Sequence, residues 1–202
     1  PRLADAWVDY GNLLWINGQP EHARFCYDHA ISIQPKAVSA MNNSAVAELL
    51  SRGMENWEVV QEAYSLLKKA SKIKSKNKIV RYNFASLLNY YRLFSAALPS
   101  WKGVATQQEV PDIYDGFAIA LQGIGKVTES KKYFAKANEA GAGEDRFSFQ
   151  FHRAASGIDG SQLGGANCLK VLGDLNKDRL RGFEVSSVRS LERTCSKWKE
   201  IN

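Results

Sequence analysis

Residues 7–35 read WVDYGNLLWINGQPEHARFCYDHAISIQP, and the spacing of six residues within this stretch indicates a pair of packed helices. Successive steps of 4, 12, 4, 3 and 5 residues separate Trp7, Gly11, Ala23, Tyr27, Ala30 and Pro35. The small side chains of Gly11 and Ala23 predict a close contact between two antiparallel helices, which the bulky Trp7 and Tyr27 surround. Pro35 ends the second helix because proline cannot continue the backbone hydrogen-bond ladder. We therefore predict two helices joined by a turn at residues 18–20.

The same frame recurs along the chain with a period of roughly 34 residues. The later units carry it at Ala63, Leu67 and Ala70, at Phe84, Ala85, Leu88, Ala97, Trp101 and Val104, and at Tyr114, Phe117, Ala118, Leu121, Gly125, Phe134 and Ala137. The second unit requires an insertion of about six residues near Arg52–Trp57, which lengthens its turn or its helices. The recurring pattern resembles the tetratricopeptide repeat (TPR) over roughly residues 4–144.

This resemblance implies an all-α fold, namely a right-handed superhelical solenoid of about four TPR helix pairs with a C-terminal helical cap. We assign residues 1–143 to the solenoid, and residues 144–202 to a fifth partial repeat and C-terminal capping helices. An apolar stripe near the end of the chain is expected to cover the open end of the solenoid, and it consists of Val188, Leu191, Cys195 and Trp198.

The net charge of +6 is unevenly distributed. Residues 68–102 contain nine Lys or Arg and no acid, whereas residues 1–67 sum to −4 and residues 103–145 to −3. This basic belt indicates an acidic partner or, alternatively, a solvated surface. Basic and aromatic residues interleave between Arg81 and Arg92, but we rank nucleic-acid binding below protein binding.

The three cysteines leave the compartment open. Cys26 falls inside a helical pattern and is expected in the core, while Cys168 and Cys195 are candidates for one disulfide or are two free thiols. The chain has no apolar run long enough for a membrane span and no basic-then-apolar leader, so it is either cytoplasmic or has lost a signal segment. Its loose repeats are similar to bacterial periplasmic TPR lipoproteins of motility or pilus assemblies, which implies a periplasmic or cell-envelope location.

Catalytic and metal-binding motifs are absent from the sequence. His22 and His29 lack a Cys or carboxylate at ligand spacing, so we expect surface histidines. The segment 174–178 begins like a calcium loop, but Arg179 and Val185 stand where such a loop needs glycine and glutamate, which favours a polar turn. We therefore expect neither an enzyme nor a cofactor.

The TPR resemblance implies a concave face lined by the first helix of each repeat. The peptide-binding groove expected on this basis contains Asn12, Trp15, Asn42, Asn43, Val46, Tyr82, Asn83, Ser86, Asn89 and Tyr90. Asn12 and Asn43 match the asparagines with which TPR domains clamp acidic chaperone tails, but Val8, Ile79 and Asn83 replace the lysines of that clamp. We expect a neutral groove, because side-chain amides can both donate to and accept from a peptide backbone. Alternatively, the asparagines only bond neighbouring helices.

Two functions follow from these observations. The first is a protein–protein interaction module that binds an extended polypeptide segment in the concave groove. The alternative is a structural scaffold subunit of a cell-envelope machine, of motility or pilus type, that uses its convex face and its ends.

Overall fold

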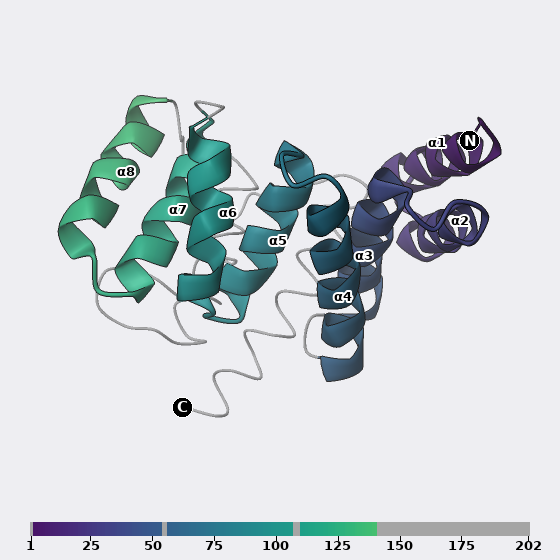
Figure 1. The fold of residues 1–202 in the computed structure, drawn as a ribbon, viewed down its shortest axis with the longest axis horizontal. Helices are drawn as coiled ribbons and strands as arrows, with labels where there is room; N and C mark the ends of the chain where they lie inside the picture. Colours follow the sequence, from purple (N-terminus) through teal and green to yellow (C-terminus); the bar gives the residue numbers. More distant parts are fainter. Residues whose placement is uncertain (1, 54–55, 107–109, 141–202) are drawn as a thin grey trace. The chain divides into compact units, whose positions relative to one another are not determined.

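The computed structural model describes residues 2–53, 56–106 and 110–140, which contain eight helices and no strand (Figure 1). The helices are α1 (Arg2–Ile16), α2 (Pro20–Ile33), α3 (Val38–Arg52), α4 (Trp57–Ile73), α5 (Lys78–Tyr90), α6 (Phe94–Ala105), α7 (Pro111–Gly123) and α8 (Val127–Glu139). The predicted all-α class is therefore confirmed for this part of the chain. The expected capping helices, Cys168, Cys195 and the calcium-like segment lie outside the described residues.

The repeat frame appears in the structure as four consecutive helix pairs. The second, third and fourth pairs begin at Val38, Lys78 and Pro111. The insertion in the second repeat lengthens its second helix, because α4 has 17 residues where α2 has 14. Proline begins α2 and α7, where its missing N–H removes no intrahelical hydrogen bond.

Each turn within a repeat uses one residue with a left-handed backbone. Gly18, Gly53 and Gly125 have φ angles of 74°, 93° and 82°, which glycine adopts without steric cost. In the third repeat this position is Arg92, with φ 59°. The turn between α5 and α6 therefore carries a backbone strain that the other three turns avoid.

The chain divides into two compact units, with the boundary between Val80 and Arg81 inside α5. The first unit contains α1 to α4 and the start of α5, and the second contains the rest of α5 with α6, α7 and α8. Each unit is described separately below.

Close contact between α1 and α2 organises the core of the first unit. A Cβ atom added at Gly11 would lie 2.5 Å from Cε1 of Tyr27, so only glycine permits this approach. Ala23 and Ala30 of α2 are fully buried in the same cluster, which Trp7 flanks from α1. The roles predicted for these residues are thus confirmed by the packing.

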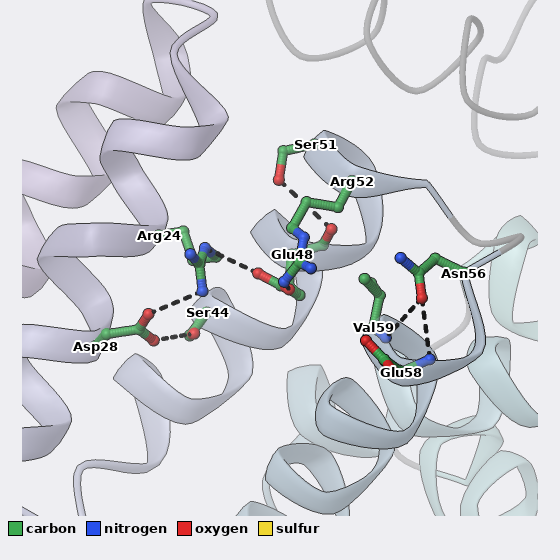
Figure 2. A network of polar contacts seen from close by, with 9 residues as sticks. All are labelled: Arg24, Asp28, Ser44, Glu48, Ser51, Arg52, Asn56, Glu58 and Val59. Carbon is green, nitrogen blue, oxygen red and sulfur yellow. Dashed lines mark hydrogen bonds and ion pairs between the residues drawn. The ribbon is translucent and has the colours of Figure 1, made fainter.

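Polar groups tie α2 to α3 at the edge of this core (Figure 2). The Glu48 carboxylate of α3 is buried and pairs with Arg24 of α2, whose Nε lies 2.8 Å from Oε2, and with Arg52 one helical turn away. Arg24 also bonds Asp28 at 3.2 Å, and Asp28 accepts a hydrogen bond from Ser44 of α3. A buried carboxylate is tolerated here because two guanidinium groups compensate its charge.

The core of the second unit is built around the Trp101 indole of α6. Trp101 is fully buried, its ring lies edge-on to Tyr82 of α5 at 5.5 Å, and it occupies the space beside Gly116 of α7. At the C-terminal end of α7, the Phe94 ring occupies the space beside Gly123, where a Cβ atom would collide with it. Trp101 therefore packs at a position of the repeat pattern, and Tyr82, which the sequence analysis assigned to the peptide-binding groove, contacts it.

Candidate functional site

A cavity of about 540 Å³ opens in the first unit between the first helices of successive repeats. We call it the α1–α3 groove, and it is lined by Asp5, Val8, Asp9, Asn12, Gln34, Lys36, Ala37, Val38, Ser39, Ala40, Asn42, Asn43, Lys74, Asn77, Ile79 and Val80. Its walls are α1, α3, the first residues of α5 and the turns that precede α3 and α5. A volume of this size falls in the range of small-molecule and cofactor sites.

Helical spacing places the polar residues of α1 on this wall. Asp5, Val8, Asp9 and Asn12 follow one another by three, one and three residues, so they lie on one face of the helix. The adjoining face of α1 carries Ala4 and Gly11 into the core, and Val8 belongs to both the groove and the core cluster. The division between groove and core is therefore already present in the α1 sequence.

A chain of side-chain amides borders the groove. Asn42 donates to Oδ1 of Asn43 at 3.0 Å, and Asn43 donates to Oδ1 of Asn12 at 2.9 Å. The hydroxyl of Tyr27 donates to the same Asn12 oxygen at 3.0 Å. These bonds join α1, α2 and α3, because Asn12, Tyr27 and Asn43 each come from a different helix. The network therefore orients amides that also line the groove.

Burial governs the titration of the two groups beside this network. Desolvation raises the pKa of the Tyr27 phenol to about 12, and a hydrogen bond with Asn43 opposes that rise. Desolvation likewise raises the pKa of the Cys26 thiol above its ordinary value. Both groups are consequently neutral at physiological pH, so the charge of the groove comes from its Asp and Lys residues.

The charged residues of the groove are separated by sign. Asp5 and Asp9 lie on α1, whereas Lys36 precedes α3 and Lys74 precedes α5. All four residues are exposed, so their charges remain screened by water and by salt. Summed over its described lining residues, the groove is neutral, but it has an acidic wall and a basic wall.

The predicted groove residues divide between the two units. Asn12, Asn42 and Asn43 line the α1–α3 groove, whereas Trp15 packs against the core cluster and neither it nor Val46 contributes to the lining. Tyr82, Asn83, Ser86, Asn89 and Tyr90 belong to the second unit.

Within that unit, two of the predicted residues are deeply buried. Asn89 donates to the backbone carbonyl of Gly116 at 2.8 Å and so joins α5 to α7. The Tyr90 ring packs edge-on against Tyr91 at 5.0 Å. Tyr82, Asn83 and Ser86 are half-buried, and Ser86 donates to the Tyr82 carbonyl. Peptide binding by the second-unit residues stays a prediction.

Sequence reasoning missed several groove residues that lie in turns, namely Gln34, Lys36, Lys74 and Asn77. Helical periodicity gives no information about turns, which explains the omission. Asp9 could have been found, because it lies one helical turn after Asp5.

We also searched the described ranges for metal-binding groups, functional histidines and membrane-spanning helices. No group of three or more His, Cys, Asp and Glu side chains there could hold a metal ion. His22 and His29 are exposed, and His29 packs edge-on against Trp7 with ring centroids 4.4 Å apart. Among the helices that the structure describes, none has the length and apolar character needed to cross a bilayer.

Comparison with known proteins supports the helical-repeat interpretation. Residues 4–37 match the tetratricopeptide repeat family model. MamA 41-end from Desulfovibrio magneticus RS-1 has a similar structure (TM-score 0.60, 14% identity, 96% of this chain and 97% of that chain). PilF from Pseudomonas aeruginosa gives a TM-score of 0.61 at 15% identity, covering 99% of this chain and 92% of its own.

A third similar structure is that of YrrB, a TPR protein with an unusual peptide-binding site. It gives a TM-score of 0.59 at 18% identity over 95% of this chain and 90% of that chain. None of the curated protein sequences matches this one. The helix pairs, the packing positions and the match over residues 4–37 together show that this chain has the fold of a tetratricopeptide-repeat protein.

Proposed function

We propose that this protein binds another polypeptide by holding an extended segment in the α1–α3 groove. The observation that carries the proposal is the amide chain of Asn42, Asn43 and Asn12 along a groove of about 540 Å³. An extended segment has unpaired backbone N–H and C=O groups, and oriented amides can satisfy both kinds. Helical repeats generally present such surfaces to protein partners rather than catalysing reactions.

The charges of the two walls define the kind of segment that fits. Asp5 and Asp9 favour a basic side chain next to α1, whereas Lys36 and Lys74 favour an acidic side chain next to the turns. Lys74 is also part of the basic belt at residues 68–102, so the belt contributes attraction for an acidic residue of the partner. YrrB has a peptide-binding site on a similar fold, which agrees with the proposal.

Titration calorimetry tests the groove with peptides selected from a phage-displayed library against the full chain. Asn12→Ala removes an amide that lines the groove, and we expect affinity to fall about 2- to 12-fold, the equivalent of one neutral hydrogen bond. Asn17→Ala is the matched control, because Asn17 is exposed in the α1–α2 turn and does not line the groove. Melting temperatures of both variants separate lost binding from lost folding.

A charge variant makes the test sharper. Lys74→Gln should lower the affinity for the selected peptides. It should also reduce the salt dependence of their binding, because salt screens the long-range attraction of the lysine within about 8–10 Å. If Asn12→Ala, Asn42→Ala and Lys74→Gln all bind as the parent does, the groove is not the binding site.

The alternative function, a scaffold subunit of a larger cell-envelope assembly, has one observation in its favour. Leu3 and Tyr10 of α1 and Phe25 of α2 are 62%, 52% and 65% exposed, so large apolar side chains meet solvent at the first repeat. Exposed apolar patches often mark protein interfaces. Analytical sedimentation of the parent and of Tyr10→Ser/Phe25→Ser measures whether the exposed side chains cause assembly. A parent that sediments as a monomer, both alone and in an extract of its source cells, would contradict this candidate.

A further inference from the structure

A second cavity, of about 550 Å³, lies in the second unit and differs in character from the α1–α3 groove. It is bounded by α6, α7 and α8, and we call it the α6–α8 cavity. Its lining residues are Leu98, Pro99, Lys102, Ala105, Thr106, Tyr114, Phe117, Leu121, Lys126, Glu129, Tyr133 and Lys136. It combines second helices of two repeats, whereas the α1–α3 groove is built from first helices.

The floor of the α6–α8 cavity is apolar and aromatic. Tyr114, Phe117 and Leu121 of α7 are buried and are spaced by three and four residues, so they form one stripe of the helix. The Tyr133 ring of α8 lies 4.5 Å from Phe117 and 6.0 Å from Tyr114. Rigid aromatic side chains of this kind offer contact area at a low entropic cost.

The rim of the cavity is basic. The described lining residues include three lysines, Lys102 of α6, Lys126 before α8 and Lys136 of α8. They include one acid, Glu129, which pairs with Lys126 at 3.5 Å. Within the described ranges, no carboxylate pairs with Lys102 or Lys136. The Lys136 ammonium instead lies over two aromatic rings, 5.7 Å from the centre of Tyr114 and 5.4 Å from that of Tyr133.

We propose that the α6–α8 cavity is a second docking site, which binds a short acidic polypeptide segment carrying an apolar side chain. The lysines on both sides of the cavity complement the carboxylates of such a segment, and the Tyr114–Phe117 floor receives its apolar side chain. A carboxylate that reaches Lys136 gains a partner whose position the two tyrosine rings already restrict.

The length of the cavity sets the length of the segment. Lys126 and Lys136 are ten residues apart, and a helix rises 1.5 Å per residue, so the two positions are about 15 Å apart along α8. An extended chain covers this distance with about four to five residues. The expected ligand is thus a pentapeptide with acidic ends and an apolar centre.

Fluorescence anisotropy with the full chain tests this proposal. The probe is a fluorescein-labelled peptide, Glu-Asp-Leu-Phe-Glu, used with one control peptide in which Gln and Asn replace the acids and another in which Gly-Gly replaces Leu-Phe. We expect saturable binding of the probe and at least 5-fold weaker binding of each control peptide. Added salt should weaken the binding of the probe, because the attraction between its carboxylates and the lysines is screened.

Variants locate the site. Lys102→Gln and Lys136→Gln should each lower the affinity for the probe at least 3-fold. Both substitutions remove an exposed charge and leave the buried residues unchanged. Lys76→Gln is the matched control in the first unit, where the same loss of charge should leave affinity within 2-fold. Asn12→Ala should also leave it unchanged, which separates this site from the α1–α3 groove.

Three outcomes would overturn the proposal. The first is no saturable binding of the probe at about 1 mM, the weakest affinity relevant to a transient interaction. The second is that Lys102→Gln and Lys136→Gln bind as Lys76→Gln does. The third is binding that appears only after Glu144→Lys and Asp145→Lys, because an acidic segment of the chain itself would then be the occupant.

Discussion

The guanidinium of Arg24 in α2 lies 2.8 Å from the carboxylate of Glu48 in α3, and the Glu48 side chain is only 2% exposed (Figure 2). Arg24 and Arg52, the two partners of Glu48, are 32% and 44% exposed. The network is therefore asymmetric, because either arginine can return to water when the pair is broken but the carboxylate cannot.

This asymmetry predicts that removing the arginines destabilises the protein more than removing the carboxylate does. Arg24→Leu should lower the free energy of unfolding by about 1–3 kcal/mol, because the buried carboxylate loses a charged partner. Arg24→Leu/Arg52→Leu should cost about 3–5 kcal/mol, whereas Glu48→Leu should cost about 1 kcal/mol or less. Urea unfolding measures all three variants, and a Glu48→Leu cost equal to that of the double variant would contradict the assignment.

Glycines inside two helices predict opposite effects of adding a methyl group. Gly11→Ala should destabilise the protein by about 1–3 kcal/mol, because the new Cβ would meet the buried ring of Tyr27. Gly103→Ala is the matched control, since the nearest atoms belong to the end of the flexible Arg81 side chain. We expect Gly103→Ala to leave the free energy of unfolding unchanged or to raise it by up to about 1 kcal/mol, because alanine has the higher helix propensity. Thermal unfolding distinguishes the two, and equal shifts would show that α1 and α2 can separate.

The left-handed backbone at Arg92 predicts a stabilising substitution. Arg92→Gly relieves a conformation that costs an L-residue about 1–2 kcal/mol, although glycine loses more backbone entropy on folding. We expect a net gain of about 0.5–1 kcal/mol in the free energy of unfolding. Lys69→Gly, at an exposed position in the interior of α4, should instead destabilise the protein. A loss of stability in Arg92→Gly, measured by urea unfolding, would mean that the arginine side chain stabilises the turn by more than the strain.

The buried phenol of Tyr27 predicts a loss of stability at high pH. Its pKa is raised from 10.0 in its ordinary environment to about 12 in the folded protein. Its contribution is fully present below pH 10 and is lost as the pH rises through about 12, because the unfolded state releases the proton first. The slope should approach about 1.4 kcal/mol per pH unit in that range.

Tyr27→Phe isolates this effect. The variant loses the hydrogen bond to Asn12 at every pH, but its stability should depend less steeply on pH between 10 and 12 than that of the parent. Denaturant unfolding at several alkaline pH values gives the comparison. Parallel curves for the parent and the variant would show that Tyr27 does not control alkaline stability.

The helices of the repeat region and the order in which they pack could be predicted from local patterns of residues. Gly11, Tyr27 and Ala30 recur as a pattern because each repeat must bring two helices together and bury the contact against the next repeat. The starts of α3, α5 and α7 could be predicted from this frame, since close packing at fixed spacing leaves little freedom in register. Cys26 was expected in the core for the same reason, and it is buried.

The tertiary structure alone decided which polar side chains line a cavity. Asn12 and Asn89 both lie on first helices, but Asn12 borders the α1–α3 groove while Asn89 bonds the backbone of α7. Lys74 joins the groove through a turn, and Lys102 and Lys136 share the α6–α8 cavity although they are 34 residues apart. Periodicity predicts the face of a helix on which a residue lies, but the neighbour that meets this face depends on how complete repeats pack, which no local pattern encodes.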